Sequence, residues 1–202
     1  VVFVWQEWDI RDRAELTLEA ASEQTAAVVE ASLRGQLNAL TMVAADAALV
    51  AKLELGRFDA LSGQLETLAD ANSDFSRLAV MAGHGRVVAN SNPDKSAVGR
   101  DFSDQAHVRG ALVDGKPTVG TPRIAASSQV PSPVLPLGVP IRRPDGTVIG
   151  ALQATTLLEE IAPLWTSLRV GTAGQVSVLT ADERVIVHRD ITRALQPAGA
   201  IP

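Results

Sequence analysis

The sequence contains no cysteine and no tyrosine, and aromatic residues make up only 3% of its 202 residues. The lack of cysteine excludes disulfide bonds, thiol catalysis and zinc–thiolate sites. Because aromatic residues are scarce, any ligand pocket must be built mainly from aliphatic, hydroxyl and charged side chains. No apolar run approaches the ~20 residues that a membrane-spanning helix needs.

Basic clusters and enzymatic motifs are also lacking. The net charge is −5, and the doublet Arg142–Arg143 stands beside a turn, where it is expected to be solvated. This balance argues against a nucleic-acid partner. The sequence has no G-x-S-x-G, no H-E-x-x-H and no P-loop. We therefore predict a protein that is not an enzyme and that needs no cofactor and no metal.

The longest regular pattern is a stretch from Asp9 to about Asp46 that has no proline and only one glycine, Gly35. Its apolar residues recur on one face of an α-helix, at Leu33, Leu37, Leu40 and Val43–Ala44. A helix of this length is either a coiled-coil arm or a spine for other modules, and we expect it to end between Asp46 and Gly56. The apolar Val1–Trp5 that precedes it is either the last turn of a transmembrane helix or a frayed terminus.

A second amphipathic helix is predicted over Arg57–Ala71, and the periodicity then changes to that of strands. Between the second and third strands we expect a short helix, Gln105–Val113. The predicted strands are Leu78–Ala82, Arg86–Ala89, Thr118–Ser127, Val134–Arg142 and Thr147–Thr155. This order favours an α+β fold, a five-stranded antiparallel sheet with the long helix packed along it.

The C-terminal part predicts a helix over Leu157–Leu168, interrupted or ended at Pro163, and then strands Gln175–Leu179 and Val185–His188. Two strands do not make a stable sheet, so this part is expected to be an incomplete second module. The predicted organisation is a helical spine with a second helix (1–72), a first module (73–156), a linking helix (157–170) and the start of a second module (171–202).

The run Val98–Leu112 resembles the loop-and-helix signature of Cache domains, which are PAS-like extracytoplasmic sensor modules of bacterial receptors. Three further segments follow in the family's order: Gly115–Gly120, Leu137–Ile141 and Asp145–Gly150. The resemblance extends over roughly residues 9–190, as in a double Cache domain. It implies a membrane-distal Cache module (73–156) and the start of a membrane-proximal one (171–202).

In this family the ligand lies between the sheet and the loop-and-helix segment, and polar residues of both hold it. The family's frequent Arg-Pro-Tyr-Phe is replaced by Gln105–Val108, so the usual arginine for a carboxylate is absent. Thr155 stands where an amine-binding aspartate is often found. The resemblance therefore does not favour the amino-acid-binding form of the pocket.

Together, the sequence pattern and the resemblance to Cache domains predict eight ligand-binding residues. Arg109 or Arg123 would supply the missing cation, and His107 would make a pH-sensitive contact. For each residue the alternative is a solvated side chain or a turn hydrogen bond. The candidates are Asp104, Gln105, His107, Arg109, Arg123, Ser127, Ser128 and Thr155.

Asp101, Asp104 and His107 recur every three residues, a spacing that also suits a metal site. We favour instead a role for Asp104 as the N-cap of the short helix.

The resemblance implies the periplasmic or extracellular part of an inner-membrane receptor that is a homodimer in its full form. Its ligand would be a small polar or anionic metabolite, such as an organic acid. The output would be a histidine kinase of a two-component system, a diguanylate cyclase or a chemoreceptor, reached through transmembrane helices outside this sequence. The alternative is a ligand-free structural or dimerisation module that mediates protein–protein interaction.

Overall fold

The computed structural model divides the chain into two compact units, residues 33–158 and residues 1–32 with 159–202. Of residues 2–17, 163–165 and 187 only the backbone is described. The described residues are 2–72, 75–92, 95–125, 132–165, 177–180, 183–187, 193–197 and 199.

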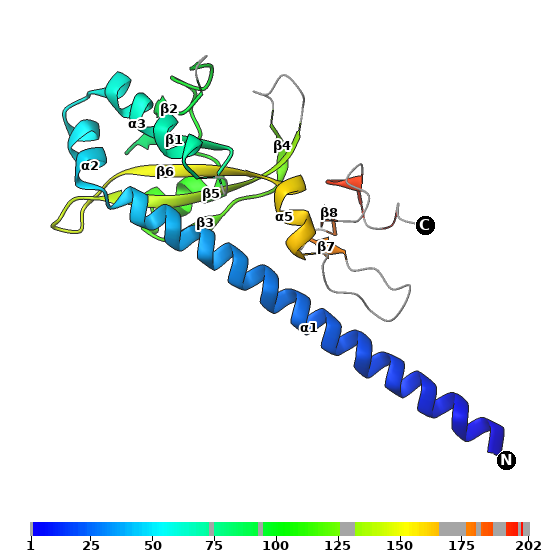
Figure 1. The fold of residues 1–202 in the computed structure, drawn as a ribbon. Helices are drawn as coiled ribbons and strands as arrows, with labels where there is room; N and C mark the ends of the chain where they lie inside the picture. Colours follow the sequence, from blue (N-terminus) through cyan, green and yellow to red (C-terminus); the bar gives the residue numbers. More distant parts are fainter. Residues whose placement is uncertain are drawn as a thin grey trace. The chain divides into compact units, whose positions relative to one another are not determined.

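The predicted long helix is confirmed as α1, Val2–Ala44 (Figure 1). Its apolar stripe is confirmed as well, since Leu40 and Ala44 are buried and Leu33 packs against the same core. The helix ends at Ala44 because Asp46 starts a new helix, α2 (Ala47–Glu54), which the sequence pattern did not separate. The Asp46 Oδ1 atom accepts hydrogen bonds from the first backbone N–H groups of α2, those of Ala48 at 2.7 Å and Leu49 at 2.9 Å.

The second predicted helix is confirmed as α3, Phe58–Asp70. Leu61 and Leu65 are completely buried in the core that also receives α1 and α2. Phe58, at the first position of the helix, is the exception in the predicted stripe, because 39% of it is exposed.

The first unit contains a six-stranded antiparallel sheet, with the order β2-β1-β6-β5-β3 and β4 also paired to β5. The prediction of five strands was wrong at Thr118–Ser127, which contains two short strands. Pro122 lies between them, and its missing N–H interrupts the ladder. The strands are β1 Arg77–Ala82, β2 Val87–Asn90, β3 Thr118–Val119, β4 Arg123–Ala125, β5 Ser132–Arg142 and β6 Val148–Leu157.

The two faces of this sheet have different partners. Successive residues of a strand point to opposite faces, and in β1 Leu78 and Val80 pack into the core formed with α1, α2 and α3. Ala79 and Met81 belong to a separate cluster with Val108 of the short helix α4 (Ala106–Leu112). Helices α1–α3 therefore cover one face, and the loop and helix between β2 and β3 cover the other.

Gly138 of β5 allows α4 to lie directly on the sheet. A Cβ atom at this position would overlap the backbone carbonyl of His107. We expect Gly138→Ala to lower the free energy of unfolding by about 1–3 kcal/mol, the usual range for overpacking. Urea denaturation measures the change.

Gly63→Ala is the matched control, because Gly63 lies on the exposed side of α3 and a Cβ there meets no atom within 4 Å. In a helix interior alanine is favoured over glycine by roughly 0.5–1 kcal/mol, so this variant is expected to be more stable than the parent. A Gly138→Ala protein as stable as the parent would show that α4 does not need the close approach.

The remaining elements are helix α5 (Leu158–Trp165), which continues through Pro163, and the antiparallel pair β7 (Val178–Leu179) and β8 (Val185–Val187). Residues 175, 176 and 188 of the two predicted strands lie outside the described residues. A second PAS-like module in this part of the chain stays a prediction. Within the described ranges, no helix has both the length and the hydropathy that crossing a membrane requires.

Candidate ligand-binding site

A cavity of about 260 Å³ lies in unit 33–158 on the sheet face opposite α1–α3. Its lining residues come from β1, β2, β4, β5 and β6 and from the loop that joins β2 to α4. The site therefore combines strands that lie far apart in the sequence.

The pairing of the strands forms the floor of the cavity. Ala79 of β1 pairs with Asn90 on one side and with Gln153 on the other, and Arg77 pairs with Thr155. Directly paired residues of antiparallel strands point to the same face. All five of these residues line the cavity, so the register alone brings together an arginine, two amides and a hydroxyl.

The loop from 91 to 105, the site loop, forms one wall and contributes Arg100, Phe102 and Gln105. It is tied to β2 by two backbone hydrogen bonds, from the Gly99 N–H to the carbonyl of Val87 at 2.8 Å and from the Val87 N–H to the carbonyl of Arg100 at 2.9 Å.

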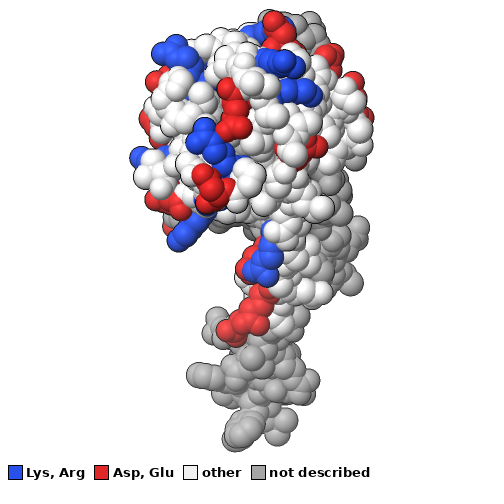
Figure 2. All heavy atoms as spheres, turned by 90° about the vertical axis from the view of Figure 1, so that its left-hand side faces the viewer, with Lys and Arg blue, Asp and Glu red and all other residues white. Residues whose placement is uncertain are grey.

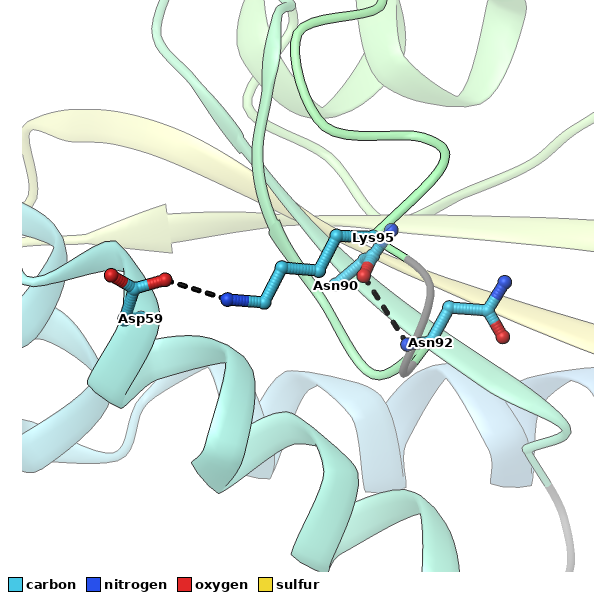
Figure 3. A network of polar contacts seen from close by, with 4 residues as sticks. All are labelled: Asp59, Asn90, Asn92 and Lys95. Carbon is cyan, nitrogen blue, oxygen red and sulfur yellow. Dashed lines mark hydrogen bonds and ion pairs between the residues drawn. The ribbon is translucent and has the colours of Figure 1, made fainter.

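Side chains attach the start of the site loop as well (Figure 3). The Lys95 Nζ atom lies 2.6 Å from Asp59 Oδ1 on α3, and the Asn92 N–H donates to Asn90 Oδ1 at 3.2 Å. The Lys95 hydrogen bond and charge lower the pKa of Asp59. Because this ion pair is exposed, it orients the loop more than it stabilises the fold.

Arg123 of β4 is the cation with the best-defined position. Its Nη1 atom donates to Gln105 Oε1, and its guanidinium carbon lies 5.7 Å from the centre of the Phe102 ring, within range of a cation–π interaction. Burial lowers the pKa of Arg123, but a guanidinium stays protonated in proteins. A half-buried, oriented guanidinium is suited to a bidentate grip on a carboxylate.

His107 of α4 lies beside the cavity, on the same face of the sheet, and contacts its floor. The residue is 1% exposed, and its Nε2 atom is 3.0 Å from Gln153 Oε1. The Nε2 atom of Gln153 in turn donates to Thr155 Oγ1 at 3.3 Å. Burial lowers the pKa of His107 to about 4, against a smaller raising effect of the Gln153 hydrogen bond, and the Arg123 charge lowers it further. The imidazole is therefore neutral at pH 7, and because Nε2 faces an oxygen of Gln153, the tautomer that fits this contact carries its proton on Nε2 and donates it to Oε1.

The charge of the described lining residues is one-sided. They include three arginines, Arg77, Arg100 and Arg123, and no aspartate or glutamate. On the face drawn in Figure 2, by contrast, Lys and Arg side chains lie among Asp and Glu side chains. Positive charge is therefore concentrated in the cavity, whereas on the surface in that view it is mixed with negative charge. A site with concentrated positive charge attracts anions.

The eight predicted site residues fall into four groups. Gln105, Arg123 and Thr155 line the cavity, and His107 contacts a lining residue. Asp104 and Arg109 are exposed and are not part of the lining. Ser127 and Ser128 lie outside the described residues.

The predicted N-cap at Asp104 was wrong by one residue, since Gln105 occupies that position in α4. Its side chain makes no capping bond and instead accepts from Arg123. The Asp101 Oδ1 atom accepts from the Ser103 N–H at 2.9 Å, which lowers the pKa of Asp101. Among the described residues no three His, Cys, Asp or Glu side chains gather into a metal site.

Sequence reasoning missed Arg77, Asn90, Arg100, Phe102 and Gln153. A usable signal existed for two of them. Asn90 and Gln153 are polar side chains in otherwise apolar strands, and Gln153 lies two residues before Thr155, on the same strand face.

Unit 33–158 is thus an α+β unit with helices on one sheet face and a cationic cavity on the other. The Cache domain model matches residues 6–201, so the chain belongs to the Cache domain family. A comparison with curated protein sequences gave no match.

Several solved structures share the fold. The ligand-binding domain of the Pseudomonas fluorescens chemoreceptor CtaA, in complex with L-leucine, has a TM-score of 0.68 at 18% identity, covering 94% of this chain and 76% of that one. The sensor domain of the Vibrio cholerae histidine kinase DctB has a TM-score of 0.67 at 15% identity, covering 91% and 70%. The ligand-binding domain of the Pseudomonas aeruginosa amino acid chemoreceptor PctC, in complex with GABA, has a TM-score of 0.63 at 20% identity, covering 92% and 81%.

Proposed function

We propose that this chain is the extracytoplasmic ligand-sensing domain of a bacterial signal-transduction receptor and that its cavity binds a small organic anion. The observation that carries the proposal is that three arginines line a cavity of about 260 Å³ and that none of its described lining residues is acidic. A carboxylate held there by Arg123 would gain charge-assisted hydrogen bonds in a partly desolvated site. The role is binding, not catalysis.

The same strands connect the cavity with α1. In β6, Gln153 faces the cavity, while its neighbours Leu152 and Ala154 lie in the core that includes Leu40 and Ala44 of α1. A ligand shifts a receptor only by binding one of its states better than another. Closure of the site loop over an anion would favour one packing of β6 against α1, which makes α1 the signal conductor.

The receptor that we propose anchors this domain in the inner membrane, on its periplasmic or extracellular side, and works as a homodimer. Its output is a histidine kinase, a diguanylate cyclase or a chemoreceptor domain. Membership of the Cache family supports this assignment, as does the shared fold of chemoreceptor and histidine kinase sensor domains.

Calorimetric titration and thermal shift with a panel of organic anions test the function. Acetate, succinate, citrate, phosphate and sulfate cover the simple geometries, and the amide of each carboxylate that binds serves as its neutral control. We expect at least one carboxylate to stabilise the domain by about 2.7 kcal/mol at a hundredfold excess over its Kd, and its amide to have no effect. A domain that no anion stabilises would instead favour a ligand-free dimerisation module.

A further inference from the structure

Most side-chain oxygens of the residues that line the cavity already accept a hydrogen bond within the protein. Five lining residues use their side-chain oxygen to accept a hydrogen bond: Gln153 from His107 Nε2, Gln105 from Arg123 Nη1, Ser91 from the Leu78 N–H, Asn90 from the Asn92 N–H and Thr155 from Gln153 Nε2. A group that needs acceptors, such as an ammonium with its three N–H donors, would have to share these oxygens.

The hydrogen-bond donors of the lining, in contrast, include groups that still need an acceptor, and a bound ligand could provide it. Asn90 is 4% exposed, and its Nδ2 atom has no hydrogen-bond partner among the described residues. The orientation of the amide is set, because Oδ1 faces the Asn92 N–H. A buried N–H without an acceptor is destabilising, and Nδ2 is shut off from bulk water. Because Asn90 lines the cavity, an oxygen of a bound ligand could supply the missing acceptor.

Thr155 adds a second donor. Its Oγ1 atom accepts from Gln153 Nε2, so the hydroxyl proton is left to donate. His107 determines which of Gln153 and Thr155 is the donor. The Nε2–H of the imidazole binds the glutamine oxygen, so the glutamine N–H groups face Thr155. Asn90 and Thr155 on the floor of the cavity are thus both arranged to donate a hydrogen bond to a ligand.

We propose that the cavity selects carboxylates whose second polar group is an oxygen over amino acids, and that Asn90 is the specificity-determining residue that binds this oxygen. The inference rests on the proposed function and narrows its ligand class to hydroxy, oxo and dicarboxylic acids. The first carboxylate pairs with Arg123, and the second oxygen accepts from Asn90 Nδ2. An ammonium in its place would face the unpaired N–H and the arginine charges, and both contacts are repulsive.

Matched ligand pairs test the selectivity. L-malate and L-aspartate, L-lactate and L-alanine, and 2-oxoglutarate and L-glutamate share a skeleton and differ in an oxygen or an ammonium at one carbon. In calorimetric titrations we expect the oxygen acid of a binding pair to have a Kd at least tenfold lower than that of its amino acid.

Asn90→Asp tests the residue. Aspartate keeps an oxygen for the Asn92 N–H and replaces the donor by a carboxylate oxygen. We expect the oxygen acid to lose at least tenfold in affinity and the preference over its amino acid to disappear. Asn38→Asp is the matched control, because it adds the same charge at an exposed position of α1 outside the lining, and its affinities are expected to stay within twofold. If Asn90→Asp does not fold, Asn90→Ala takes its place, because it removes the donor without adding charge. The same loss of preference for the oxygen acid over its amino acid is expected of this variant.

Equal or tighter binding of the amino acids overturns the proposed selectivity and leaves the sensing function in place. An unchanged preference in the folded Asn90 variants overturns the role of Asn90. If no member of any pair binds, the selectivity is overturned. If the simple anions also fail to bind, the proposed function falls with it.

Discussion

Replacing Arg123 with alanine is expected to weaken the binding of a carboxylate ligand by about 2–4 kcal/mol, roughly 30- to 1,000-fold. The guanidinium is half-buried, oriented by Gln105 and stacked near Phe102, so its contact with an anion is poorly screened by water. Arg123→Lys keeps the charge but loses the planar fork, and an intermediate affinity is expected. Calorimetric titration with the tightest-binding acid of the panel measures all three proteins.

Arg109→Ala is the control, since it removes the same charge from the exposed side of α4. Its affinity is expected to stay within about twofold of the parent value, because exposed charges outside the site are screened by salt. Equal losses in both variants would mean that the ligand responds to the overall charge of the domain. The guanidinium of β4 would then not be its binding partner.

The contrast between Arg123 and Arg109 illustrates what the sequence is able to predict about the site. Both are arginines near the loop-and-helix segment, and the sequence offers either as the cation. The choice depends on the pairing of β4 with β5, where Arg123 lies opposite Val134, and such pairing is not encoded in local spacing. Asn90 and Gln153 were missed for the same reason, because each is joined to the other through Ala79 of a third strand.

The helices were easier to predict, since their signals lie within a few residues of one another. The stripe from Leu33 to Ala44 defines the buried face of α1, and Leu61 and Leu65 do the same for α3. The element boundaries that the periodicity did not predict depend on single residues. Asp46 separates α2 from α1 by capping it, and Pro122 divides the predicted third strand into β3 and β4.

His107 was predicted to be a pH-sensitive contact of the ligand, and its buried position gives it a different titration. The proximity to the cavity follows from its place on α4, but the burial depends on Gly138 and Gln153 of two distant strands. A histidine enclosed in this way loses the hydration of its charged form, so its pKa falls to about 4. Its protonation then affects folding at acidic pH, below the range in which free histidine titrates.

We accordingly expect unit 33–158 to lose stability as the pH falls from 6.5 to 4. In this window the unfolded chain binds a proton on His107, whose unfolded pKa is about 6.5, whereas the folded protein does not. Because the unfolded state binds more protons, the free energy of unfolding decreases with decreasing pH, and the contribution of His107 to this loss levels off below about pH 4. The shift corresponds to about 3 kcal/mol over the whole window. Urea denaturation at pH 7, 6, 5 and 4 measures it.

His107→Gln is expected to flatten this dependence, because a neutral amide at position 107 takes up no proton. His84→Gln removes a histidine from an exposed hairpin turn and is expected to retain the full loss of stability. The lowered pKa values of Asp59, Asp101 and Asp145 add a destabilising protonation that begins near their usual value of 3.8, so it contributes at pH 4 in parent and variant alike and leaves the points at pH 5 to 7 to His107. A His107→Gln protein with the pH dependence of the parent would therefore mean that His107 is not held neutral beside the cavity floor, and the donor orientation of Gln153 and Thr155 would lose its support.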